Sequence, residues 1–353
     1  MPTTKIAGYE ALTAKSRCLM GMLLKKEQYS ELLLTKSLPE AADYLRNLPS
    51  YRSTFEQIEP SRIGRSTLEY LLEQNLIEVY VRFYKFSHGA ERSFFAGLLR
   101  EFEVYYLLEA IKTCLTGTES DHLYRLPTFF NHHSDLNFHR IFSSRTPSEL
   151  LDALSGTEYY QSCGPMLSGT QDFDFLLLES LLYKHYYHKL YYSDAKVLNR
   201  ADAAAFRTAL TYRVDLINLV KIMRMRRFAK VSKGEMTSVS NLLSYLIPLR
   251  LHLTDGDITR IASAQNDARA LEICDSIFPG FSELLNADKY QGNIIEYYMK
   301  KHAEKLTRNP GHSLMTVYGF LILKGIEVNN IIHAIEAIRY SLPPSLGEHS
   351  LVL

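Results

Sequence analysis

The sequence predicts an all-α protein, and three observations support this prediction. Apolar residues recur every three or four positions along most of the 353 residues, which is the spacing of one face of a helix. Glycine and proline, which interrupt helices, are scarce at 17 and 12 residues. We find no segment that alternates apolar and polar residues as a half-buried strand would, and no Asn-Gly hairpin turn.

Residues that favour helix ends set the boundaries in the first half of the chain. Ser37, followed three positions later by Glu40, is a capping-box pattern, and Pro39 fits the first turn of the short helix that it opens. Gly117 follows a long periodic run and ends a helix. The predicted elements are helices over residues 9–34, 38–48, 67–86 and 92–115, then a loop-like stretch over residues 118–142.

The second half of the chain continues the same pattern. Thr146, Pro147 and Glu149 repeat the cap, the proline in the first turn and the following glutamate. Pro343 and Pro344 end the last helix. The predicted helices cover residues 173–192, 199–228, 239–245, 257–264, 267–277, 291–306, 314–324 and 327–340.

Composition argues against several classes of protein. Lys and Arg total 40 and Asp and Glu total 39, so the formal net charge is +1, whereas a whole-surface nucleic-acid binder carries a basic excess. No apolar run reaches the roughly 18 residues of a membrane-spanning helix, and we expect no signal peptide. The four cysteines stand far apart and form no CxxC motif, so they are interpreted as reduced thiols of a cytosolic protein.

Internal repetition is the strongest signal in the sequence. Residues 40–51 align with residues 149–160 at an offset of 109, which places Tyr51 on Tyr160. Residues 107–112 align with residues 216–221 at the same offset. A weaker third copy follows. We therefore expect three helical units, over residues 1–117, 118–230 and 231–353.

An acidic residue followed three positions later by asparagine occurs in two of these units. The pairs are Asp215 with Asn218 and Glu327 with Asn330. At the 109-residue offset, the first unit has Tyr106 in place of the acidic residue and Glu109 in place of the asparagine. The first unit is thus expected to depart in detail from the other two.

Two groups of histidines are candidates for a metal site. His185 and His188 share one helix face near Glu179, but no third ligand lies one turn away on that face. The second group lies in the loop-like stretch and contains no cysteine; its members are His132, His133, Asp135 and His139. We predict no metal site, with solvated or helix-capping histidines as the simpler interpretation.

No catalytic or cofactor motif is present. The chain has no Gly-rich dinucleotide loop, no phosphate-binding P-loop, no GxSxG nucleophile motif and no EF-hand loop. We therefore predict no catalytic residues and no cofactor, and we expect that the chain does not hydrolyse ATP. These absences favour a scaffold over an enzyme.

One local run of positive charge is a candidate partner-binding surface. It comprises Lys221, Arg224, Arg226, Arg227 and Lys230, here called the basic cluster. Exposed cations steer association with an acidic partner or an anionic surface. The alternative is a solvated helix C-terminus, because cations stabilise that end of the helix dipole.

Three features together resemble the C subunits of the bacterial and archaeal V/A-type rotary ATPases, whose eukaryotic counterparts are the d subunits of the V-ATPase. The first is the opening pattern, in which Tyr9, Arg17 and Tyr29 lie at matching intervals. The others are the blocks ending in Tyr51 and Tyr160 and the helices that carry the acidic-x-x-Asn pairs. The resemblance covers nearly the whole chain.

The resemblance implies an all-helical funnel of three similar parts around a pseudo-threefold axis. It implies a non-catalytic rotor component that joins the central stalk to the membrane proteolipid ring, so that ATP turnover drives H⁺ or Na⁺ transport. The chain would then be peripheral, on the cytoplasmic face of the membrane. A cytosolic helical-repeat adaptor that binds other proteins remains the alternative, and an enzyme with an unrecognised all-α site comes third.

Overall fold

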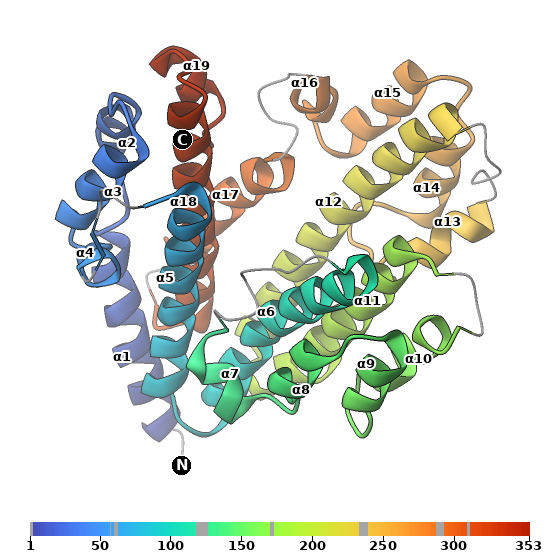
Figure 1. The fold of residues 1–353 in the computed structure, drawn as a ribbon, viewed down its shortest axis with the longest axis horizontal. Coiled ribbons are helices and arrows are strands. Elements are labelled where there is room, and N and C mark those ends of the chain that lie inside the picture. Colours follow the sequence, from blue (N-terminus) through green and yellow to red (C-terminus); the bar gives the residue numbers. More distant parts are fainter. Residues whose placement is uncertain are drawn as a thin grey trace. The chain divides into compact units, whose positions relative to one another are not determined.

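The computed structural model describes residues 3–56, 58–59, 63–117, 126–169, 173–232, 239–286, 293–308 and 311–353. These residues form helices joined by turns and contain no strand (Figure 1), so the all-α prediction is confirmed for them. None of the described helices is both long and apolar enough to cross a membrane. The elements are α1 (Thr3–Met20), α2 (Lys26–Leu33), α3 (Leu38–Asn47), α4 (Arg52–Phe55), α5 (Arg65–Phe86), α6 (Gly89–Thr116), α7 (Thr128–His133), α8 (Phe138–Ser143), α9 (Pro147–Ala153), α10 (Tyr160–Leu167), α11 (Phe175–Tyr192), the 3₁₀ helix η3 (Asp194–Val197), α12 (Arg200–Ser232), α13 (Val239–Tyr245), α14 (Asp255–Ala262), α15 (Asp267–Ile277), α16 (Phe281–Asn286), α17 (Ile294–Thr307), α18 (Leu314–Arg339) and α19 (Pro344–His349).

The chain forms two compact units. Unit 1 comprises Met1–Arg92, Asn199–Ala209 and Phe278–Leu353, and unit 2 comprises Ser93–Leu198 and Leu210–Ile277. The long helices α6 and α12 contribute residues to both units. The division into three sequence units, and their arrangement about an axis, stays a prediction.

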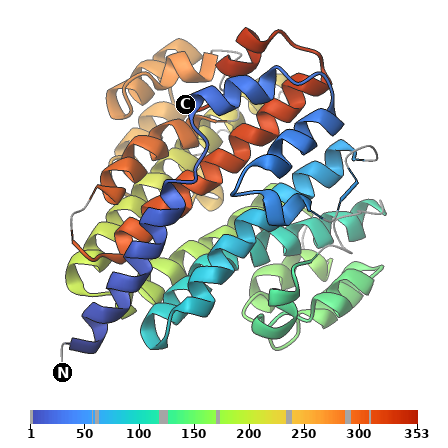
Figure 2. The same cartoon turned by 90° about the vertical axis from the view of Figure 1, so that its left-hand side faces the viewer.

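Unit 1 is built around α18. Helices α1, α2, α3, α5 and α17 all pack against it, and Figure 2 shows α18 in red running beside the blue N-terminal helices. Buried residues lie on every side of α18, as expected of a helix that is surrounded by others. Gly319 permits close packing of α17, because a Cβ there would lie 2.8 Å from the carbonyl oxygen of Ala303.

Two helix predictions in unit 1 are wrong. Residues 314–324 and 327–340 were expected as separate helices, but α18 runs through Gly325 without a break. A glycine in a helix costs about 1 kcal/mol relative to alanine, and burial along α18 outweighs that cost. Residues 9–34 were expected as one helix, but α1 ends at Met20 and α2 begins at Lys26.

The predicted caps are present at two helix starts. Ser37 Oγ accepts a hydrogen bond from Glu40 N at 3.3 Å, and Glu40 Oε2 accepts one from Lys36 N at 2.8 Å. The start of α9 repeats this arrangement, since Thr146 Oγ1 accepts from Glu149 N at 3.2 Å and Glu149 Oε2 accepts from Arg145 N at 2.8 Å. Both helices thus begin with the same reciprocal pair of bonds.

The turns that follow α3 and α9 also match at the 109-residue offset. Leu48 N donates to Leu45 O, and Thr157 N donates to Leu154 O. The next bonds, from Tyr51 N to Leu48 O and from Tyr160 N to Thr157 O, match in the same way. The local repeat predicted for residues 40–51 and 149–160 is therefore present in the backbone.

Unit 2 contains helices within the stretch that was predicted as a loop. Residues 118–125 lie outside the described residues, but α7 and α8 form within residues 126–143. Phe130, Phe138 and Ile141 are buried. The prediction of a loop is therefore wrong for α7 and α8, because these apolar side chains supply enough burial to fold short helices.

Candidate functional site

Three buried carboxylates recur along the chain at a spacing of 112 residues. They are Glu103 on α6, Asp215 on α12 and Glu327 on α18, and their residues are 7%, 0% and 3% exposed. Buried carboxylates are rare unless hydrogen-bonded or paired with a cation. Each of the three contacts the chain segment that leads into a short helix.

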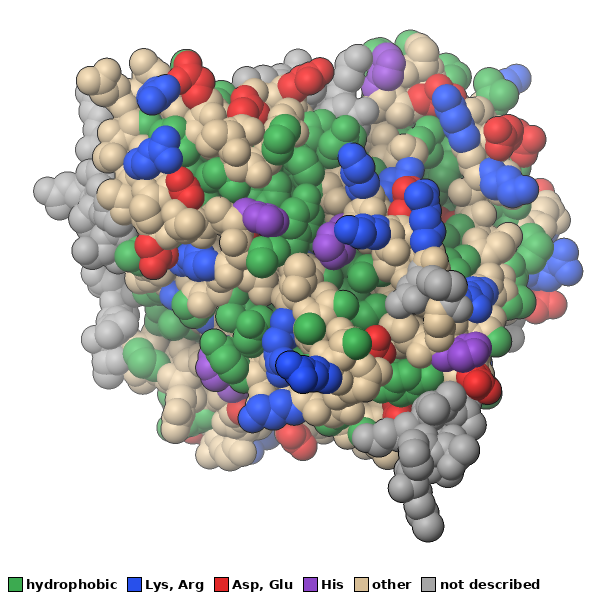
Figure 3. All heavy atoms as spheres, turned by 180° about the vertical axis from the view of Figure 1, so that it is seen from behind, with side chains coloured by type: hydrophobic (Ala, Val, Ile, Leu, Met, Phe, Trp, Pro, Cys, Tyr) green, Lys and Arg blue, Asp and Glu red, His purple; other side chains and the backbone are tan. Residues whose placement is uncertain are grey.

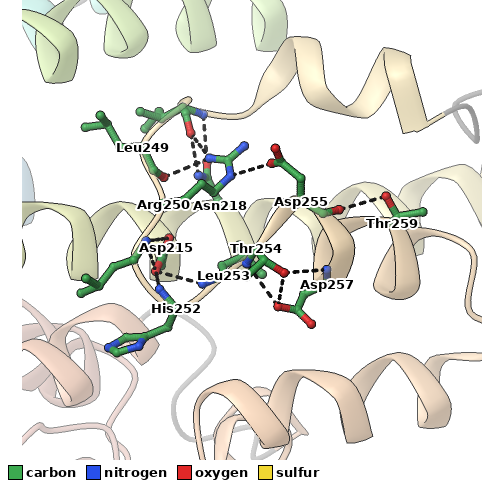
Figure 4. A network of polar contacts seen from close by, with 12 residues as sticks. Asp215, Asn218, Leu249, Arg250, His252, Leu253, Thr254, Asp255, Asp257 and Thr259 are labelled. Atoms are coloured by element: carbon green, nitrogen blue, oxygen red, sulfur yellow. Dashed lines mark hydrogen bonds and ion pairs between the residues drawn. The ribbon is translucent and has the colours of Figure 1, made fainter.

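Asp215 holds the segment before α14. Its carboxylate accepts hydrogen bonds from the backbone N–H groups of Leu251 (3.1 Å), His252 (2.5 Å) and Leu253 (3.1 Å). Figure 4 shows the carboxylate directed at this loop. Burial raises the pKa of Asp215, and the backbone hydrogen bonds oppose that rise. The three donors thus stabilise a carboxylate that would otherwise be costly to bury.

Asn218, one turn further along α12, fixes the same loop at a second point. Its Nδ2 donates to Ile247 O at 2.9 Å, and its Oδ1 accepts from Ile247 N at 2.9 Å. Lys184 Nζ donates to Ser244 O. Arg250 donates to Leu249 O at 3.0 Å and to Asp255 Oδ1 at 3.1 Å (Figure 4). Side chains therefore hold the backbone of the loop along its length.

Glu327 makes the corresponding contacts in unit 1. Its carboxylate accepts hydrogen bonds from Leu24 N, from the Tyr51 hydroxyl at 2.6 Å and from Lys324 Nζ at 2.7 Å. Burial raises the pKa of Tyr51 well above its ordinary value and lowers the pKa of Lys324. The ion pair is therefore desolvated, and it fixes both the start of α2 and the turn before α4 to α18.

Asn330 repeats the role of Asn218. Its Nδ2 donates to Val352 O at 3.1 Å, and its Oδ1 accepts from Val352 N at 2.8 Å. An asparagine side chain can satisfy both backbone polar groups of one residue in this way. The acidic-x-x-Asn pairs of the sequence are therefore backbone clamps in both units.

Glu103 is the third carboxylate of the series. Ser134, whose Oγ accepts from Leu136 N at 3.1 Å, lowers the pKa of Glu103, and burial together with Glu103 raises the pKa of Tyr159. Burial raises the pKa of Glu103 to about 7, against the opposing effects of Ser134 and Arg100. Arg100 itself pairs with Asp194.

Tyr106 and Glu109, which stand at the 109-residue offset, do not make the contacts of the acidic-x-x-Asn pairs. Tyr106 is buried, with its ring centroid 6.0 Å from that of Phe130. Glu109 is half-buried, with Oε1 4.0 Å from Lys112 Nζ. Asp215 and Glu327 are 112 residues apart, and the same step back from Asp215 reaches the buried Glu103.

The tyrosines after α3 and α9 show a one-residue difference. Tyr51 is fully buried, but Tyr160, its partner at the 109-residue offset, is 41% exposed. Tyr159 is 3% exposed instead, and burial together with the charge of Glu103 raises its pKa, whereas Tyr51 donates a hydrogen bond to Glu327. The backbone turn keeps the predicted 109-residue offset. The buried tyrosine of the second copy, however, is Tyr159, one residue before Tyr160.

The basic cluster is not a single exposed patch. Lys221 Nζ donates to Ser180 Oγ at 2.8 Å and lies 3.7 Å from Glu179 Oε2. Arg224 is exposed and Arg227 is half-buried. The side chain of Lys230 lies outside the described part of the structure. In Figure 3, Lys and Arg side chains occur in several separate groups on the face shown.

Arg226 has a structural role in unit 2. Its side chain is 12% exposed and donates to the carbonyl oxygens of Ile261 (2.8 Å), Ala262 (2.6 Å) and Ala264 (3.0 Å). These carbonyls lie at the C-terminal end of α14, where backbone acceptors lack helical partners. Asp267 Oδ1 lies 3.6 Å from the guanidinium.

The candidate histidines do not assemble into a ligand set. His185 Nε2 lies 3.3 Å from Glu158 Oε2, and the ring of His188 lies 4.5 Å from that of Tyr192. His133 packs against Phe129. Across the described residues, no group of three His, Cys, Asp or Glu side chains is close enough to hold a metal ion.

A cavity of about 460 Å³ lies in unit 2, between α6 and α11. Its walls are mostly aromatic and aliphatic, with charged side chains that belong to local ion pairs. The lining includes Tyr105, Leu108, Glu109, Phe175, Glu179 and Tyr183.

Comparison with known proteins shows which family the chain matches. The model of the ATP synthase (C/AC39) subunit family matches residues 12–347. The C subunit of the A-type ATP synthase of Archaeoglobus fulgidus is 20% identical over 352 residues, covering 98% of this chain and 97% of that protein. Its counterpart in Methanothermobacter thermautotrophicus is 22% identical over 327 residues, covering 90% and 80%. The chain therefore belongs to the ATP synthase (C/AC39) subunit family.

Proposed function

We propose that the chain is a non-catalytic component of the central rotor of a V/A-type ATPase or ATP synthase. In this role it is the socket between the central stalk and the membrane proteolipid ring. ATP is then made or hydrolysed by other subunits, and this chain transmits rotation so that the reaction is coupled to H⁺ or Na⁺ transport. Family membership and the matched length of the A-type relatives support the assignment.

The observation that carries the proposal is the series of buried carboxylates on α6, α12 and α18. A coupling between two rotating parts must resist twisting, so its helices have to be fixed to the segments around them. Glu103, Asp215 and Glu327 each hold a loop against a long helix. Buried polar networks that are fully satisfied make packing unique and rigid.

The same series supports an arrangement of three similar units about a pseudo-threefold axis. A spacing of 112 residues, repeated twice, is what three equivalent long helices would produce. Each carboxylate meets the segment leading into the next short helix, namely α8, α14 and α2 in turn. The last of these returns to the N-terminus, which suits a closed arrangement over an open solenoid.

Within the basic cluster, Arg224 and Arg227 are the proposed contacts with the stalk or the ring. Lys221 and Arg226 serve the fold of unit 2 instead. Exposed cations at the edge of an interface chiefly steer association and are screened by salt. The strength of binding through Arg224 and Arg227 of α12 would therefore depend on ionic strength.

Reconstitution tests the proposed function. Membrane complexes are purified from cells with and without the chain, and ATP-driven ion transport is compared with ATP hydrolysis. We expect the chain to copurify with the ATPase subunits, and its loss to abolish ion transport while the catalytic head still hydrolyses ATP. Fully coupled transport in complexes that lack the chain would contradict the proposal.

A salt series tests the proposed contacts. Arg224→Glu combined with Arg227→Glu should weaken binding to stalk and ring at low salt and less so at high salt. Arg269→Glu is the control, since Arg269 is an exposed helical arginine outside the basic cluster, paired with Glu272 at 2.5 Å. Binding by the double variant that equals the control at every salt concentration would remove these residues from the interface.

A further inference from the structure

The cavity between α6 and α11 has the size and the lining of a small-molecule site. Its volume of about 460 Å³ falls within the roughly 300–1,000 Å³ of ligand pockets in proteins. Three of its apolar lining residues, Leu115, Phe173 and Phe175, are 36–41% exposed. Solvent therefore reaches the apolar surface of the cavity.

Two half-buried carboxylates, those of Glu109 on α6 and Glu179 on α11, also line the cavity. Lys112 Nζ lies 4.0 Å from Glu109 Oε1, and Lys221 Nζ lies 3.7 Å from Glu179 Oε2. Both distances are longer than a hydrogen bond, and Lys221 donates to Ser180 Oγ at 2.8 Å instead. Both carboxylates can therefore accept hydrogen bonds from a ligand that carries a positive charge.

Aromatic rings make up much of the remaining lining. They belong to Tyr105, Phe173, Phe175 and Tyr183. The face of an aromatic ring attracts a cation, and the same rings offer apolar surface to the body of a ligand. Carboxylates and aromatic rings around one cavity favour a ligand that is both cationic and apolar.

Helix α5 of unit 1 corresponds to α11 in its pattern of burial. The two helices begin 110 residues apart, at Arg65 and Phe175. Fully buried leucines occupy the same places in both, namely Leu68 and Leu72 in α5 and Leu178 and Leu182 in α11. Glu69 and Glu179 then take the same place, the fifth residue of each helix.

In unit 1, a cation of the chain itself fills the corresponding position. Arg65 Nε donates to Glu69 Oε1 at 2.9 Å, and the guanidinium also pairs with Glu336 of the facing helix α18. Glu336 lies 224 residues after Lys112 of α6, which is twice the 112-residue spacing, and Lys112 lines the cavity. Unit 2 thus keeps the glutamate of α11 but has the phenyl group of Phe175 where unit 1 has a guanidinium.

We propose that the cavity between α6 and α11 binds a small organic cation with an ammonium or guanidinium head and an aromatic body. The head lies between Glu109 and Glu179, as the guanidinium of Arg65 lies between two glutamates in unit 1. The body packs against the aromatic rings of the lining. The site involves residues of unit 2 alone, so it does not depend on the proposed rotor function.

A matched pair of probes tests the charge of the ligand. Phenylbutylguanidinium is titrated into the 353-residue chain by calorimetry, and phenylbutylurea serves as a neutral probe of the same shape. We expect one guanidinium probe to bind per chain and the urea to bind about tenfold more weakly, because hydrogen bonds between charged partners are the stronger ones. No binding of the guanidinium, or equal affinity for both probes, would overturn the proposal.

Variants then test the place of binding. Glu179→Gln should weaken binding of phenylbutylguanidinium about tenfold, whereas Glu69→Gln, the matched control on α5, should leave it unchanged because Arg65 occupies that position. Phe175→Arg should abolish binding, because it supplies the guanidinium that unit 1 already has. Equal effects of Glu179→Gln and Glu69→Gln would show that the probe does not bind in this cavity.

One measurement on the parent chain applies even if a variant fails to fold. With labelled tyrosine, nuclear Overhauser effects should connect the ring protons of the bound guanidinium probe to the rings of Tyr105 and Tyr183, which line the cavity. Contacts to other tyrosines in place of these two would contradict the assignment of the site.

Discussion

Asn330 satisfies both backbone polar groups of Val352 with one side chain, donating to the carbonyl oxygen at 3.1 Å and accepting from the N–H at 2.8 Å. Asn218 does the same for Ile247 in the other unit. Two such pairs, each one turn beyond a buried carboxylate, show that the acidic-x-x-Asn pattern is a device for holding the chain to a long helix. Its contribution to the free energy of unfolding can be measured.

Removing either asparagine clamp should destabilise the chain. Asn218→Ala leaves the buried N–H of Ile247 without a partner, whereas the C=O keeps Arg250 as a donor. An unsatisfied buried group costs about 1–3 kcal/mol. Asn330→Ala should behave alike at Val352. The free energy of unfolding in urea is the measurement, with the exposed Asn47→Ala as the control. Equal stability of all three variants would show that the clamps contribute nothing.

The ion pair on α18 should show strong coupling between its members. Lys324→Met leaves the buried carboxylate of Glu327 without its cation, which costs about 3–5 kcal/mol. The double variant Lys324→Met with Glu327→Gln should recover much of that loss, because the uncompensated charge is gone. Tyr51→Phe removes the hydrogen bond that its hydroxyl donates to Glu327 and the one that it accepts from Lys324. Each such bond to a charged group contributes about 1.5–3 kcal/mol. Additive losses in the Lys324 and Glu327 variants would contradict the pairing.

The helices of this chain could be predicted from periodicity, but the register between repeats could not. Residues 107–112 and 216–221 are mostly apolar, and a helix shifted by three residues presents nearly the same apolar face. The 109-residue alignment and the 112-residue spacing therefore match the apolar pattern about equally well. The turns after α3 and α9 follow the 109-residue offset, whereas the buried carboxylates Glu103, Asp215 and Glu327 follow the 112-residue spacing.

The role of Arg226 could not be predicted from the sequence, for a different reason. Arg224 and Arg227 lie close to it in sequence, and such a run of cations is typical of a solvated helix C-terminus. Its partners, however, are backbone carbonyls that lie 35 to 38 residues away. Carbonyl groups are present at every residue and leave no signature in the amino-acid pattern, so only the fold reveals that this arginine caps α14.

Acid pH should weaken the contacts of Glu158 in unit 2. His185, whose Nε2 lies 3.3 Å from Oε2, and the hydrogen-bonded Lys189 lower the pKa of Glu158 to about 2. Its contribution is therefore present above the unfolded pKa of 4.5 and is lost as pH falls toward 2. Glu158→Gln should cost about 1 kcal/mol at pH 7, since the group is partly exposed and screened.

The pH dependence of that loss distinguishes it from a simple packing defect. Urea unfolding at pH 7 and at pH 2.5 should show the difference between parent and Glu158→Gln shrinking toward zero in acid. Glu272→Gln is the control, because Glu272 is exposed and pairs with Arg269 one turn away on its own helix. A difference that persists undiminished at pH 2.5 would show that the carboxylate charge is not its source.

Arg226 and Arg224 stand two residues apart on α12, yet they should respond differently to substitution. Arg226→Leu removes three hydrogen bonds to carbonyl oxygens at the end of α14 and leaves those acceptors to compete for water in a half-buried place. Losing a charged donor of this kind costs about 1.5–3 kcal/mol in unfolding free energy. Arg224→Leu changes an exposed position and should stay within about 0.5 kcal/mol of the parent.

Urea unfolding of the two variants at neutral pH, with hydrogen exchange across residues 255–267 as a local readout, measures both effects. If Arg226→Leu were as stable as Arg224→Leu and exchange at the end of α14 were unchanged, the guanidinium would not be the cap that its geometry indicates.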